Sequence, residues 1–113
     1  MSLAQNRFAH NIEARSHVRF SDIRLGQPVS LTQSVDGAGA IGDCMCDLVR
    51  QWSGSPRASL VSLHQPAGGL TPDTVAGHVL ARHLDGSNQA DVEILGRAQD
   101  IICLRAVVRV ALA

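Results

Sequence analysis

The clearest pattern in the chain is an apolar stripe that runs from position 41 to position 52. Its members are Ile41, Cys44, Met45, Leu48, Val49 and Trp52. They recur at intervals of three and four residues, which places side chains on one face of an α-helix. The Ser53-Gly54-Ser55-Pro56 stretch that follows is typical of a helix end, because glycine accepts a left-handed backbone and proline cannot continue a helix. We therefore predict an amphipathic helix over residues 40–52.

A second helix is predicted over residues 71–84 from its start signals. Thr71 is a suitable capping residue, and proline at position 72 suits the first helical position. Asp73 would lie near the positive end of the helix dipole. The inner stripe of this helix would be formed by Val75, Ala76, Val79, Leu80 and either His83 or Leu84. Asp85-Gly86-Ser87-Asn88 would form the exit loop.

Strands are predicted where apolar and polar residues alternate with a period of two. Residues 29–35 show this alternation, and residues 100–113 carry apolar side chains at every even position from 102 to 112. Residues 58–64 are apolar on both faces, which predicts a central strand. Residues 16–25 and 90–95 complete the set.

The resulting order, β-β-α-β-α-β-β, predicts an α+β fold in which two helices cover one face of a single mixed β-sheet. Residues 16–113 would form one domain, and residues 1–15, which show no clear pattern, would form a flexible arm. The second sheet face would be bare in a monomer and would need cover. The pattern therefore predicts a homo-oligomer.

Composition narrows the classes of partner. Ten basic residues, all arginine, balance ten acidic ones, and there are only three aromatic residues. A neutral chain with few stacking platforms is not expected to bind nucleic acid. The absence of lysine excludes Schiff-base chemistry and a Walker-type phosphate loop. No apolar run reaches the roughly 20 residues that span a membrane, and three cysteines predict reduced thiols in the cytoplasm.

The run Gly37-Ala38-Gly39-Ala40-Ile41-Gly42 matches the G-x-G-x-x-G spacing of a dinucleotide-binding turn. The next strand, however, ends in His64-Gln65-Pro66, where that fold needs an acidic residue for the ribose. We therefore expect no cofactor, and dinucleotide binding at Gly37–Gly42 is the third of three functional hypotheses. Two other interpretations stay open: a small anion on the N–H groups near Gly37 and Gly39, or a turn followed by close helix–sheet packing.

Metal ligands are not predicted, because no histidine pair and no cysteine pair has ligand spacing. Arg105 and Arg109 share one face of the last predicted strand and could clamp a carboxylate or phosphate of a ligand. The structural alternative is an exposed sheet face, or salt bridges between subunits to Asp91 or Glu93. His64 ends a predicted central strand, where functional groups often lie.

The last two thirds of the chain, residues 36–113, resemble the RidA/YjgF family, which has a chorismate-mutase-like fold. The resemblance lies in the predicted helix 71–84, the strand Asp91-Val92-Glu93-Ile94, the turn at residues 96–100 and the final strand from Ile101 to Val108. It implies a homotrimer with ligand clefts between subunits and the hydrolysis of reactive imines or enamines. The family's substrate-binding arginine would fall near Gln89 or Ala90, and its acidic residue in the final strand would fall near Arg105. This sequence has neither the arginine nor the acidic residue at these positions. Arg97 and Arg105 are then the remaining cationic candidates.

The leading hypothesis is a small cytoplasmic homotrimer that binds a small anionic metabolite between subunits, either as a RidA-like hydrolase or as an inactive relative. Its ligand would be held by Arg97, Arg105, Arg109 and His64. The second hypothesis is a non-enzymatic subunit or scaffold that docks another protein through its sheet face.

Overall fold

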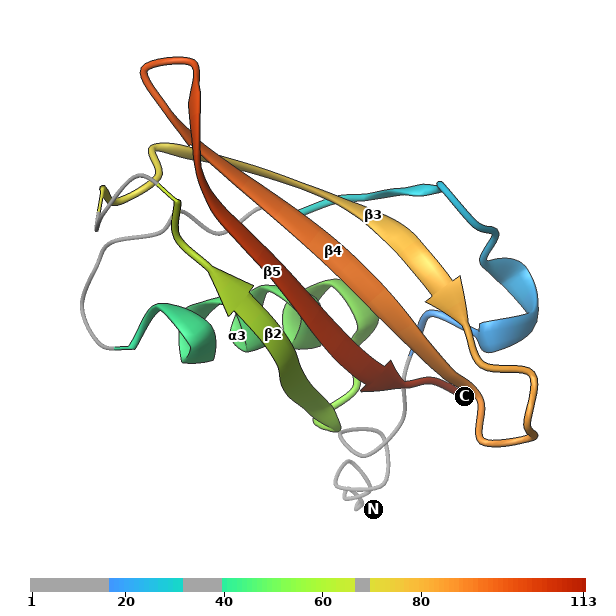
Figure 1. Cartoon of the computed structure of the whole chain (residues 1–113). Coiled ribbons are helices and arrows are strands. Elements are labelled where there is room, and N and C mark those ends of the chain that lie inside the picture. Colours follow the sequence, from blue (N-terminus) through green and yellow to red (C-terminus); the bar gives the residue numbers. More distant parts are fainter. Residues whose placement is uncertain (1–16, 32–39, 67–69) are drawn as a thin grey trace, which may run out of the picture.

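In the computed structural model, which describes residues 17–31, 40–66 and 70–113, one helix lies behind one antiparallel sheet (Figure 1). The sheet is built in the order β1-β3-β4-β5-β2, and all four neighbouring pairs are antiparallel. The α+β class is therefore confirmed, whereas the predicted mixed sheet is wrong. The elements are the 3-10 helix η1 (Phe20–Asp22), β1 (Pro28–Val29), α3 (Ile41–Ser53), β2 (Ala58–His64), β3 (Thr74–Arg82), β4 (Gln89–Ala98) and β5 (Ile101–Ala111).

Helix α3 confirms the first predicted helix to within one residue at each end. Its apolar stripe faces the sheet, with Met45, Leu48 and Val49 buried. Gly54 ends the helix in the left-handed conformation (φ 75°), and its N–H donates to the carbonyl of Arg50. Glycine is the residue that takes this conformation without steric cost.

The second predicted helix is wrong, because residues 74–82 form strand β3. Val75 and Val79 lie on the core side of the strand, and the β-branched side chain of valine suits a pleated strand. The start signals have a different role, since Pro72 is almost fully buried and lies against Gly96 of β4. The predicted exit loop after residue 84 is instead the turn of a β3–β4 hairpin. Only one α-helix in the described part of the chain covers the sheet, so the predicted two-helix, chorismate-mutase-like architecture is not confirmed.

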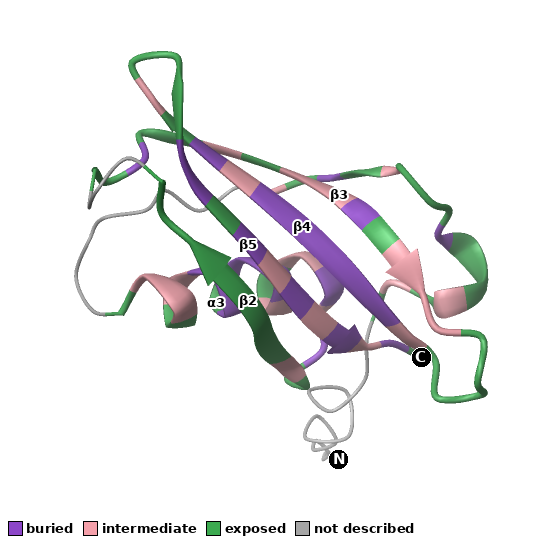
Figure 2. Ribbon diagram, in the orientation of Figure 1, coloured by how far each residue is buried: buried purple, intermediate pink, exposed green. Residues whose placement is uncertain are grey.

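Strand β2 has the predicted bounds, but it lies at the edge of the sheet and not in its centre. Six of its seven residues are exposed. Figure 2 shows the contrast between the exposed β2 and the mostly buried central strand β4. Its apolar residues on both faces arise in part from a bulge between Leu60 and Ser62, which shifts the alternation by one position.

The N-terminal strand predicted over residues 16–25 is also absent from the described residues, where η1 stands instead. Ile23 is buried, and Arg82 holds the segment against β3. The guanidinium of Arg82 lies 4.5 Å from the ring centre of Phe20, and its Nη2 donates to the Phe20 carbonyl at 3.2 Å. Of the predicted strand 29–35 only Val29 is assigned as strand, at the end of β1, and residues 32–39 lie outside the described part.

The core lies between α3 and the central strands. Val92 and Ile94 of β4 and Leu104, Ala106 and Val108 of β5 are fully buried under the helix stripe. The described residues contain no helix that is both long enough and apolar enough to span a bilayer. The opposite face of the sheet is left open by α3, and it carries the polar side chains of β4 and β5.

Candidate functional site

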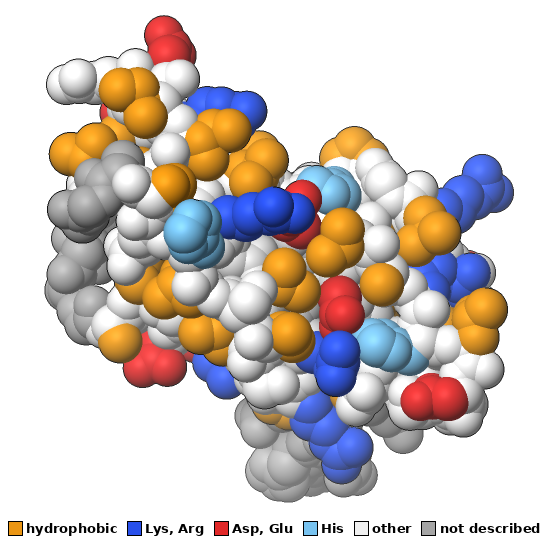
Figure 3. Space-filling view, viewed as in Figure 1, with side chains coloured by type: hydrophobic (Ala, Val, Ile, Leu, Met, Phe, Trp, Pro, Cys, Tyr) orange, Lys and Arg blue, Asp and Glu red, His pale blue; other side chains and the backbone are white. Residues whose placement is uncertain are grey.

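Charged side chains form two rows across the open face of the sheet. Figure 3 shows this face, where arginine, acidic and histidine side chains lie next to one another across the strands. The carboxylates and arginines at the centre of the rows come from alternate positions of β4 and β5, because successive residues of a strand point to opposite faces. Each row is centred on one carboxylate of β4, Glu93 or Asp91.

The Glu93 row runs from β2 to β3. His64 is opposite Arg105 in the β2–β5 pair, the Nε of Arg105 donates to Glu93 Oε2, and the Nε2 of His78 lies 3.2 Å from Glu93 Oε1. Glu93 is only 6% exposed, so the arginine and the histidine cover it on both sides. His64, Arg105, Glu93 and His78 thus follow one line across four strands.

The Asp91 row has a bidentate ion pair at its centre. The Nε and Nη2 of Arg109 donate to the two carboxylate oxygens of Asp91 at 2.8 Å and 3.2 Å. The Nε2 of His83 lies 3.1 Å from Oδ1 of the same carboxylate. A fork-to-fork arginine–carboxylate pair is stronger and more directional than a single contact.

These contacts bear on both interpretations of Arg105 and Arg109. Both arginines pair with Glu93 and Asp91, the carboxylates that the structural alternative named, but they do so within one chain. Their charges are therefore balanced in the row itself. Either arginine can bind a ligand only through the guanidinium N–H groups that its ion pair does not use.

Asp91 makes the ion pair sensitive to acid. Burial by itself raises the pKa of this carboxyl group, but the hydrogen bond from Arg109, helped by His83, outweighs burial and lowers the pKa below its ordinary value. A carboxyl group whose pKa is lower in the folded chain adds stability above its unfolded pKa of roughly 4. That contribution is lost as the pH falls through the folded pKa.

We therefore expect the Asp91 ion pair to stabilise the fold at pH 7 and to stop doing so in acid. Urea unfolding of the wild type and Asp91→Asn, followed by circular dichroism from pH 7 to pH 3, should show a stability difference that shrinks below about pH 4. Arg109→Gln removes the same bond from the other side and should reduce the pH dependence in the same way. A difference that stays constant across this range would show that the ion pair does not stabilise the fold.

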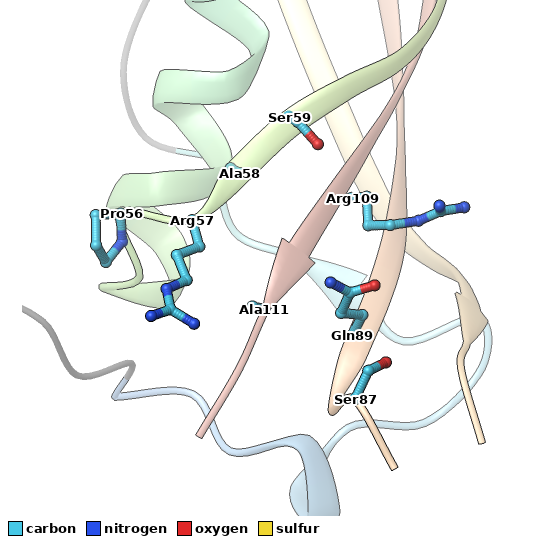
Figure 4. Close-up of a pocket in the computed structure, with 8 residues that line it drawn as sticks. All are labelled: Pro56, Arg57, Ala58, Ser59, Ser87, Gln89, Arg109 and Ala111. Carbon is cyan, nitrogen blue, oxygen red and sulfur yellow. The ribbon is translucent and has the colours of Figure 1, made fainter. Parts of the chain in front are cut away.

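A pocket of about 330 Å³ opens beside the Asp91 row. It lies where β2 begins, β5 ends and the β3–β4 loop enters β4. Arg57 and Arg109 lie on opposite sides of it, with Ser59, Ser87 and Gln89 between them (Figure 4). No acidic residue is among the described residues that line it, and the remaining lining residues are Pro56, Ala58 and Ala111.

The predicted site residues do not all meet in this pocket. Arg109 lines it, whereas Arg105 and His64 lie further along β5 and β2. Arg97 pairs with Thr74 near the β4–β5 turn, at the other end of β4 from Gln89. Arg109 is the one predicted residue among the lining residues, and the other polar ones, Arg57, Ser59, Ser87 and Gln89, were not predicted. Arg57 directly precedes a predicted strand, but no pattern in the sequence indicates that this strand lies beside β5.

The glycine motif lies mostly outside the described residues, which exclude Gly37 and Gly39. Gly42 is described, and a Cβ atom placed there would lie 2.9 Å from Cδ2 of Leu60. This close approach of α3 to β2 agrees with the packing interpretation of the third glycine. In addition, β1 and β2, on either side of α3, lie at opposite edges of an antiparallel sheet, whereas a dinucleotide turn joins neighbouring parallel strands.

In the described ranges, no group of three or more histidine, cysteine, aspartate or glutamate side chains is arranged to hold a metal ion. Cys46 and Cys103 are buried and Cys44 is half-buried, all as free thiols, and burial raises the pKa of the Cys46 thiol. Comparisons of the chain with family models, with curated proteins and with solved structures found no match.

Proposed function

We propose that the protein binds a small anionic metabolite, with a carboxylate or phosphate group, in the pocket between Arg57 and Arg109. The observation that carries this proposal is the lining, which combines two arginine, two serine and one glutamine side chain, with the Arg109 guanidinium directed away from Arg57 (Figure 4). Arginine is suited to carboxylate and phosphate because its donors form a planar fork. Serine hydroxyl and glutamine amide groups can donate further hydrogen bonds to the same anion.

Arg57 is the principal ligand group in this proposal. Its side chain is exposed, and its guanidinium makes no hydrogen bond or ion pair with the described residues. Arg109 gives its Nε and Nη2 to Asp91. A guanidinium has five N–H donors, so Arg109 keeps donors for a ligand while Asp91 holds it in place.

The pocket of a single chain supports binding better than catalysis. Its described lining residues include no histidine, carboxylate or cysteine side chain that could act as a general acid or base. The hydrolysis of an imine or enamine, which the RidA/YjgF resemblance implies, needs a group that transfers protons. Such a group would have to come from outside the pocket of one chain.

The test is a calorimetric titration with inorganic phosphate and with small dicarboxylates in a buffer without competing anions. We expect Arg57→Ala to weaken binding about 10- to 100-fold, because a hydrogen bond to a charged group contributes about 1.5–3 kcal/mol. Binding should also weaken with added salt.

Arg24→Ala is the matched control, since Arg24 is an exposed arginine far along the chain from the pocket residues. It should leave the affinity unchanged. Equal losses in the two variants would mean that the anions respond to overall charge and not to the pocket. If no anion binds at millimolar concentration, the proposal fails and the scaffold hypothesis, docking through the sheet face, is favoured.

A further inference from the structure

Strand β2 ends the sheet with an edge that no described strand covers. It pairs with β5 on one side, and the sheet order stops there. Its sequence, Ala-Ser-Leu-Val-Ser-Leu-His, contains no Asp, Glu, Lys, Arg or Pro. Natural proteins usually protect a free edge with charges, proline or a very short strand, because unpaired N–H and C=O groups recruit other strands. At the opposite edge, β1 is only two residues long and contains Pro28.

The exposed side chains of β2 are also apolar. Leu60, Val61 and Leu63 are 40%, 48% and 37% exposed. Three large apolar side chains on a strand of seven residues form the kind of surface that a partner usually covers. The bulge at Val61 is the one protective device in the strand, and it leaves residues on both sides of it free to pair outward.

The strand is complementary to a second copy of itself. Leu60 points to the helix side, where it lies against Gly42, and Leu63 shares that side because their partners Val108 and Ala106 are two residues apart on β5. Ser59 and His64 lie on the open face, opposite Arg109 and Arg105. An antiparallel two-fold pairing can therefore place Leu60 opposite the partner subunit's Leu63 and Ser59 opposite the partner subunit's His64. Apolar residues then meet on one face and polar residues on the other.

We propose that two copies of the chain associate through antiparallel pairing of their β2 edges, and that the partner subunit's His64 completes the pocket between Arg57 and Arg109. Ser59 lines that pocket, so a residue opposite Ser59 on the same face lies at its rim. The partner subunit's Arg105 follows one strand further along the same row. The assembly makes one continuous sheet of ten strands, two sets of five, and each pocket gains an imidazole group that can form a hydrogen bond with a ligand.

Association is tested on the full chain without any ligand. Light scattering and sedimentation at about 100 μM should give twice the mass of one chain for the wild type and the mass of one chain for Val61→Lys, because the two lysines would lie close together on either side of the two-fold axis and repel each other. Leu84→Lys is the control: Leu84 is 83% exposed in the β3–β4 loop, away from β2, and this variant should stay dimeric. Circular dichroism must show that Val61→Lys is folded. A monomeric or trimeric wild type, or a folded Val61→Lys dimer, would overturn the proposal.

The register is tested by disulfide formation in a Cys44→Ser background. A mixture of Ser59→Cys chains with His64→Cys chains should cross-link in high yield, because directly opposite residues of antiparallel strands have Cα atoms within disulfide range. Each variant alone should cross-link poorly. Efficient cross-linking of one variant alone, or none in the mixture, would reject this register.

The contribution of His64 to the pocket rests on the proposed anion binding. The following experiment distinguishes a failure of the completed pocket from a failure of the anion-binding function. In phosphate titrations we expect His64→Ala to remain dimeric and to bind several-fold more weakly, because the substitution removes a hydrogen-bond donor at the rim of the pocket. Ser62→Ala, on the same strand and face, is the matched control and should bind like the wild type. Dimers that bind phosphate equally with and without His64 would refute the completed pocket, whereas dimers that bind no phosphate at all would refute the proposed function.

Discussion

Replacing Leu104 with alanine is expected to lower the free energy of unfolding by about 2–5 kcal/mol. Leu104 is fully buried in β5, where it pairs with Gly96 of the neighbouring strand. Truncating its side chain removes apolar contacts and leaves a cavity that the surrounding strands fill only in part. Urea unfolding followed by circular dichroism measures the loss directly as a lower midpoint with an unchanged slope.

Leu84→Ala is the matched control for this experiment. The same atoms are removed, but Leu84 is 83% exposed. Surface substitutions usually change stability by no more than about 0.5 kcal/mol. If Leu104→Ala were as mild as Leu84→Ala, the core described between α3 and the central strands would not be the one that holds this fold together.

The second large effect is expected at Gly96, where any side chain meets two fixed neighbours. A Cβ atom at this position would lie 2.8 Å from Cβ of Pro72 and 3.0 Å from Cβ of Leu104. Both neighbouring atoms are attached directly to the backbone, and both residues are buried, so neither can move aside by changing a rotamer. Gly96→Ala should therefore destabilise the protein by about 1–3 kcal/mol through overpacking.

Gly77→Ala provides the comparison on the next strand. There the nearest atom to an added Cβ is Cδ1 of Leu31 at 3.0 Å, at the far end of a side chain that can rotate. We expect its cost to be less than half that of Gly96→Ala in the same thermal or urea measurement. An equal cost at both sites would mean that loss of backbone freedom, and not the clash with Pro72, decides the effect.

Two segments were predicted to be helical, but only residues 41–52 form a helix, whereas most of residues 71–84 form strand β3. The stripe at 41–52 combines a period near 3.6 with a glycine that can end the helix, and both features are present in α3. The 71–84 segment has helix start signals, but its valines favour a strand once β4 is available as a partner. Glycine at position 77 disfavours a helix interior. Pairing between distant residues overrides local preference here, and a single sequence does not contain that information.

The candidate site was predictable only where it lies on one strand. The alternation in the last strand predicted that Arg105 and Arg109 share one face. Salt bridges to Asp91 or Glu93 were one structural alternative, but they were expected between subunits, whereas the ion pairs form within one chain. The pocket, in contrast, joins residues from β2, β4, β5 and a loop. Arg57 and Gln89 lie 32 positions apart, and only the strand order β4-β5-β2 brings them to one opening. Local patterns do not encode that order.

The strand order has a further consequence for how the chain reaches this structure. β3, β4 and β5 follow one another as neighbouring hairpins, so most of the sheet forms by closing short loops, which costs little chain entropy. β2 must cross from the helix to the far side of β5 and pairs with a strand about 40 residues away, which closes a longer loop. The C-terminal meander is thus the natural folding nucleus, and the strand that we assign to self-association is added to it afterwards.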